Sequence, residues 1–132
     1  MNESKSQVLD VGNCTPDHHM IRMMLERHFD VEIDRVMFVD EALEKMRRTK
    51  YDLVLFNRLI FEDGGEGLEL VRRAKADESI QLAPMMMISN YPEAQVAAVA
   101  AGAAEGFGKS KLFAPETVGK VGRYLKEVSS AK

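Results

Sequence analysis

Short apolar runs alternate along the chain with longer amphipathic stretches. The runs at 53–56 and 85–88 are continuously apolar, which is typical of strands buried on both faces of a parallel sheet. Shorter runs predict further strands at 8–11, 31–37 and 105–108. Helical spacing of apolar residues predicts helices that begin near residues 17, 41, 68, 93 and 115, the fourth ending at Gly102 and the last running to 128. Five strand–helix units predict a parallel sheet with helices on both faces.

Length and composition predict one folded domain. The chain has 132 residues, of which 45% are hydrophobic, and the polar segments at 1–6 and 129–132 read as disordered ends around a domain at 7–128. The net charge of -3 means that the chain lacks the excess of basic residues typical of nucleic-acid binders. No apolar run is long enough to span a membrane. With Cys14 as its one cysteine and no signal-peptide core, the chain is expected to be cytoplasmic.

The residues that follow the predicted strands are the candidates for function. In parallel sheets of this kind, ligands bind beyond the carboxyl ends of the strands, where the strand order reverses. We therefore expect the loops there to converge on one crevice. Its candidate residues are Gly12, Asn13, Cys14, Asn57, Arg58, Ser89, Asn90, Lys109 and Ser110.

Three segments of the chain carry a resemblance to a known family. They are the strand at 52–56 followed by Asn57, the strand at 85–88 followed by Ser89, and Ala101-Gly102-Ala103 followed by Lys109. In order and separation they resemble the receiver domain of bacterial two-component response regulators, over residues 7–127. The resemblance implies an α/β flavodoxin-like (βα)5 fold with a five-stranded parallel sheet of order 2-1-3-4-5. It also implies a role in phosphorelay signal transduction rather than an enzyme activity.

The residues that carry the chemistry of that family are replaced in this chain. Receivers accept a phosphoryl group on an aspartate at the end of the third strand, and a magnesium ion is held by that aspartate and an acidic pair after the first strand. Here the acceptor position is Asn57, and the acidic pair falls at Gly12 and Asn13. A neutral amide is a poor nucleophile, and magnesium requires hard oxygen ligands such as carboxylates. The sequence therefore predicts no metal, no cofactor and no catalytic residue.

The residues that sense the phosphoryl group are partly kept. Ser89 and Lys109 match the family's hydroxyl and lysine, whereas the position of its aromatic switch corresponds to Gly106, with Phe107 beside it. A lysine ammonium enclosed without a carboxylate is costly. We therefore expect Lys109 to reach water or to pair with a nearby acid, the candidates being Glu62, Asp63 and Glu66.

Together these features predict a pseudo-receiver, a signalling module that binds another protein without being phosphorylated on aspartate. The expected partner is a histidine kinase, a phosphotransfer protein or an output protein, and a homodimer is a further expectation. Met20 and Met23 on the first helix are the candidate contact residues, with the face of the last two helices as a second surface.

Two other interpretations stay open at this point. In the first, the chain is phosphorylated on a displaced aspartate, for which Asp10, Asp52 and Asp63 are the candidates. In the second, the crevice binds a small anion through Asn57, Ser89 and Lys109.

Two further motifs are interpreted without a function. Residues 103–110 fit a relaxed phosphate-loop pattern, but a predicted strand lies inside it, so we treat the match as a false positive. The neighbouring His18 and His19 diverge on a helix and match no zinc spacing. They are expected to lie at a solvated helix start.

Overall fold

The computed structural model describes residues 5–128, so the predicted disordered ends fall almost entirely outside the described residues. Within this range five strands alternate with helices. The strands are β1 (Ser6–Val11), β2 (Val31–Val36), β3 (Leu53–Asn57), β4 (Met85–Ile88) and β5 (Ala104–Phe107). The helices are α1 (Thr15–His28), α2 (Val39–Arg48), α3 (Leu68–Ala76), α4 (Pro92–Ala101), the short 3-10 helix η1 (Lys109–Lys111) and α5 (Pro115–Gly122).

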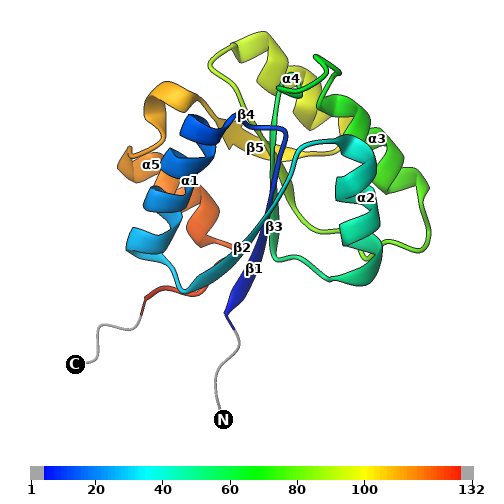
Figure 1. The fold of residues 1–132 in the computed structure, drawn as a ribbon. Coiled ribbons are helices and arrows are strands. Elements are labelled where there is room, and N and C mark those ends of the chain that lie inside the picture. Colours follow the sequence, from blue (N-terminus) through cyan, green and yellow to red (C-terminus); the bar gives the residue numbers. More distant parts are fainter. Residues whose placement is uncertain (1–4, 129–132) are drawn as a thin grey trace.

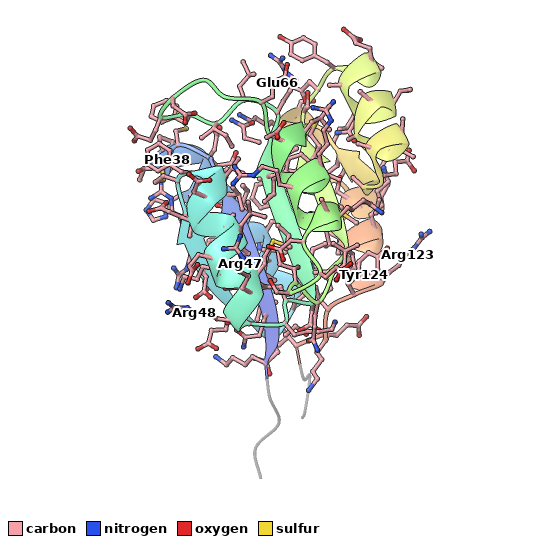
Figure 2. The ribbon with its side chains drawn as sticks, turned by 90° about the vertical axis from the view of Figure 1, so that its right-hand side faces the viewer. Phe38, Arg47, Arg48, Glu66, Arg123 and Tyr124 are labelled. Carbon is pink, nitrogen blue, oxygen red and sulfur yellow. The ribbon has the colours of Figure 1, made fainter. Side chains whose placement is uncertain are left out.

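The strands form one parallel sheet with the order β2-β1-β3-β4-β5, as predicted. Helices α1 and α5 cover one face, and α2, α3 and α4 cover the other (Figure 1). In Figure 2, Phe38 before α2 and Glu66 before α3 mark the end of the molecule where the strands finish, while Arg47 and Arg48 mark the opposite end of α2. All five loops that follow the strands therefore meet at one end.

Alternate residues of the central strands build a separate core on each face. On β3, Val54 and Phe56 pack beneath α2 and α3, whereas Leu53 and Leu55 pack beneath α1 and α5. All four side chains are fully buried, and burial of each stabilises the fold by roughly 1.5–3 kcal/mol. The prediction of strands buried on both faces is confirmed.

The boundaries differ from the prediction at both ends of the domain. β1 begins at Ser6, two residues before the predicted strand at 8–11, because Ser6 N donates to Asp30 O at 3.0 Å. The last helix ends at Gly122 instead of 128. Beyond it the chain pairs with the turn after α1, where Asp30 N donates to Lys126 O at 2.8 Å and Val128 N donates to His28 O at 3.1 Å. These bonds replace further turns of helix.

No helix within residues 5–128 combines the length and the apolar character that crossing a bilayer requires.

Candidate functional site

A crevice of about 430 Å³ opens at the carboxyl ends of β3 and β4. We call it the β3–β4 crevice. Its lining residues are Asn57, Arg58, Leu59, Ile88, Ser89, Asn90, Tyr91 and Lys109. Five of the predicted candidates are thus brought together: Asn57, Arg58, Ser89, Asn90 and Lys109. The other four, Gly12, Asn13, Cys14 and Ser110, are not among its lining residues.

Gly12, which the resemblance to receiver domains places at the first position of the acidic pair, is covered by a neighbouring loop. Its φ of +78° lies in the left-handed region, where a side chain is strained. A Cβ placed there would lie 2.5 Å from Ile60 Cδ1 and 3.3 Å from Ile60 Cα. Ile60 is itself buried, and Phe61 N donates to Gly12 O at 2.9 Å. Apolar packing therefore occupies the space that a carboxylate would need.

The loop between β3 and α3 holds Ile60 in this place. Ile60 N donates to Gly65 O at 2.8 Å, and Leu59 pairs with Glu66 in an antiparallel bridge. Asn57 serves the same loop, because its Nδ2 donates to Leu59 O at 2.6 Å. The side chain of Asn57 therefore stabilises the local turn.

Asn13, the residue after Gly12, belongs to a buried polar network. Its Nδ2 donates to Asp10 Oδ1 at 2.6 Å, and His18 Nδ1 lies 2.5 Å from Asp10 Oδ2. All three side chains are buried. The prediction of a solvated start for α1 is therefore wrong for His18, although His19 is exposed.

The sequence did contain a signal for this network. Asp10 sits in an apolar strand between Leu9 and Val11, and a buried carboxylate requires hydrogen-bonding partners. A polar residue one or two turns into the next helix is the expected partner of such a carboxylate. His18 is that residue, because α1 packs directly on the face of β1 that carries Asp10.

Ser89 and Lys109 reach the crevice in different ways. Ser89 is buried, and its Oγ accepts a hydrogen bond from Tyr91 N at 3.2 Å. Lys109 Nζ lies 2.8 Å from Asp17 Oδ2 on α1, and the lysine side chain is 40% exposed. Lys109 thus pairs with an acid and reaches water, as expected. The prediction of Glu62, Asp63 or Glu66 as its partner was wrong, because the acid that Lys109 meets is Asp17 on α1.

The charge of the crevice is the reverse of what a metal site requires. Arg58 stacks on the ring of Tyr91 at 4.9 Å from the ring centre, and Lys109 stands among the other lining residues. None of the described residues that line the crevice is Asp or Glu. Residues 5–128 also contain no group of three His, Cys, Asp or Glu side chains placed to hold a metal ion. The residues present do not fit magnesium.

Gly106, which the resemblance places at the aromatic-switch position, has no room for a side chain. A Cβ on Gly106 would lie 2.1 Å from the carbonyl oxygen of Met87. Gln95 of α4 covers this place: its Oε1 accepts from Gly106 N at 3.1 Å, and its Nε2 donates to Met87 O at 2.9 Å. The sequence did not predict this role of Gln95. The feature that could have indicated it is a long polar side chain in a helix made mostly of Ala and Val.

Apolar side chains are exposed on α1 and α4. Met20 is 43% exposed and Met23 49%, which leaves both candidate contact residues accessible. On α4, Val96 is 70% exposed and Val99 47%. These are the two surfaces on which the sequence predicted partner contacts.

Comparisons with known proteins place the fold. No protein-family model and no curated protein matches the sequence. Solved structures do match. The chemotaxis protein CheY4 of Vibrio cholerae has a TM-score of 0.71 and 23% identity, over 92% of this chain and 100% of that one. A response regulator from Hahella chejuensis has a TM-score of 0.66 and 23% identity, over 91% and 95%.

A third match allows a comparison of the site. The receiver domain of the sensor histidine kinase PA1611 from Pseudomonas aeruginosa, solved with magnesium coordinated in its active-site cleft, has a TM-score of 0.70 and 16% identity, over 92% of this chain and 98% of that one. In the present chain the corresponding end of the sheet has Gly12 under Ile60 and no lining carboxylate. The chain has the fold of the response regulator receiver domains.

Proposed function

We propose that the chain is a receiver-like signalling module that acts by binding another protein and is not phosphorylated on aspartate. One observation carries this proposal: Ile60 packs where the first metal-binding acid would stand, and no carboxylate lines the adjoining crevice. Phosphoryl transfer to a carboxylate needs both a nucleophilic oxygen and a cation that neutralises the developing charge. No described residue that lines the crevice is a carboxylate that could act as the nucleophile or as a ligand of a divalent cation.

The three aspartates considered as displaced acceptors do not offer a substitute. Asp10 is fully buried, and both of its oxygens are hydrogen-bonded. Asp52 precedes β3, at the opposite end of the sheet, and its Oδ2 accepts from Gln7 N at 2.8 Å. Asp63 accepts from Gly65 N at 2.8 Å within the exposed loop. None of the three lies in the crevice beside Ser89.

The phosphorylation test uses acetyl phosphate, magnesium and intact-mass measurement. We expect no phosphoryl adduct on the wild-type chain, and none on Asn57→Asp, because that variant still has no carboxylate at Gly12 or Asn13. An authentic receiver domain in the same tube is the positive control. A stoichiometric adduct that hydroxylamine removes, on either form, would overturn the proposal.

The binding surface is tested with two charge substitutions. We infer that a kinase, a phosphotransfer protein or an output protein contacts either the apolar residues of α1 or those of α4. Partners are crosslinked in the native cell and compared for wild type, Met23→Lys and Val96→Lys. Both changes add one charge at an exposed position, so folding is expected to be retained. A specific partner lost in one variant identifies the face, whereas no specific partner in wild type contradicts the proposal.

A second candidate function rests on the charge of the β3–β4 crevice. Arg58 and Lys109 line it together with neutral Asn57, Ser89 and Asn90, which is the chemistry of an anion site. Titration with inorganic phosphate, followed by amide chemical shifts, is expected to move residues 88–91. Arg58→Gln is expected to abolish the response and Arg48→Gln, on distant α2, to preserve it. Equal responses in both variants would exclude the crevice as the site.

A further inference from the structure

Helix α4 is held on the sheet by little apolar packing. Of its ten residues, all of which the structure describes, Ala98 alone is buried. The other α-helices each bury at least one larger apolar side chain, for example Leu43 of α2 and Leu70 of α3. A methyl group removes much less apolar surface from water than a leucine side chain does. Apolar burial therefore contributes less to the attachment of α4 than to that of the other helices.

The edge strand β5, against which α4 packs, has an irregular register (Figure 1). Its pairing with β4 shifts between Ala104 and Phe107, so residues 105 and 106 stand opposite Met87 alone. An extra residue of this kind interrupts the ladder of hydrogen bonds between two strands. The backbone groups at such a point need other partners, because a buried amide or carbonyl without one is destabilising.

The side chain of Gln95 joins α4 to this irregular point. Its Oε1 accepts from Gly106 N at 3.1 Å, and its Nε2 donates to Met87 O at 2.9 Å. Nε2 also lies 3.2 Å from Ser89 O and 3.4 Å from Phe107 O, both within hydrogen-bond distance. One side chain of α4 thus contacts the backbone of β4, of β5 and of the residue that follows β4.

Gly106 is also held from the opposite face of the sheet. Lys120 of α5 donates from Nζ to Gly106 O at 2.9 Å. A Cβ on Gly106 would clash with Met87 O and crowd Gln95 Oε1, so the close approach of the amide side chain requires glycine here. Gln95 therefore holds the irregular part of β5 on the α4 side, and Lys120 holds it on the α5 side.

We propose that Gln95 is a polar clamp that makes α4 and the irregular part of β5 one structural unit and so sets the position of the exposed Val96 and Val99. When the clamp opens, α4 and Gly106 lose their contacts together while the central strands stay folded. The meaning of the clamp for partner binding rests on the proposed function, because α4 is one of its two candidate surfaces. The clamp itself does not, so it can fail while the phosphorylation and crosslinking results stand.

Native-state hydrogen exchange, followed by NMR residue by residue, tests the clamp in the full chain without a partner. In the wild type we expect the amides of residues 98–101 and of Gly106 to open together. Their protection factors should agree within about fivefold and lie at least about tenfold below those of residues 53–56 in β3. Opening of α4 only together with β3, or opening of Gly106 separately from α4, would overturn the proposal.

Three variants locate the effect. Gln95→Leu keeps a side chain of similar length without hydrogen bonds, and it should speed exchange at 98–101 and Gly106 at least about tenfold. Gln81→Leu, at an exposed glutamine outside α4, should change it less than about twofold. Ile21→Val, in buried α1 packing on the other face, should speed exchange in β3 about threefold or more and in α4 less than about twofold.

Equal effects of the two leucine variants on α4 would overturn the proposal. So would an effect of Ile21→Val on α4 as large as its effect on β3, because α4 would then open only when the whole domain unfolds. If Gln95→Leu does not fold, the wild type and Ile21→Val still decide between a separate unit and global unfolding.

Discussion

Adding a single methyl group at Gly12 tests whether Ile60 leaves no room for a side chain at this position. Gly12→Ala places a Cβ on a backbone with φ of +78°, at 2.5 Å from Ile60 Cδ1. The left-handed conformation costs a side chain roughly 1–2 kcal/mol. Crowding a packed site costs roughly 1–3 kcal/mol more, and Ile60 has little room to move because it is buried in the core beneath α2 and α3. We expect a loss of about 2–4 kcal/mol in the free energy of unfolding.

Gly64 provides the control for the backbone term. Its φ of +69° is close to that of Gly12, but a Cβ there meets no atom within 4 Å. Gly64→Ala is therefore expected to cost about 1 kcal/mol, the conformational term alone. The difference between the two alanine variants measures the contact with Ile60.

Ile60→Val removes the one atom that the new methyl group approaches most closely. Alone it is expected to cost about 1 kcal/mol. In the double variant, the loss in the free energy of unfolding is expected to be smaller than the sum of the two single losses by about 1 kcal/mol or more. Urea unfolding at constant m-value measures this difference. If Gly12→Ala destabilises no more than Gly64→Ala, or if the cycle shows no coupling, Ile60 does not close the site and the reasoning fails.

Two further predictions concern the polar network and acid stability. The hydrogen bond from the Ser79 side chain lowers the pKa of Asp77 to about 2, so this carboxylate stabilises the fold above its unfolded pKa of about 4 and ceases to do so as the pH falls toward 2. Asp77→Asn should make the free energy of unfolding depend less on pH between about 2 and 4. An unchanged slope in this pH range would contradict the prediction. His18→Phe leaves buried Asp10 without one partner and should cost about 3 kcal/mol in urea unfolding, against less than about 0.5 kcal/mol for exposed His19→Phe. Equal losses in the two histidine variants would contradict the network.

The order of elements was predictable from the sequence because it depends on local information. Residues 53–56 of β3 are buried on both faces of the sheet, and their apolar run shows this directly. That this strand ends in Asn57 is likewise visible once the strand end is located. Element ends were less predictable: α5 stops at Gly122 because the chain beyond it pairs with the distant turn at Asp30, which no local pattern reveals.

Side-chain partners depended on the tertiary structure, since they join segments far apart in the chain. Lys109 could be predicted to need an acid, but which acid it meets, Asp17, was decided by the packing of α1 against η1. The sequence showed that position 12 carries no carboxylate. Only the folded loop after β3 shows that Ile60 fills its place. Periodicity along a chain determines which face of an element is buried, whereas the contacts between loops depend on how the whole sheet brings them together.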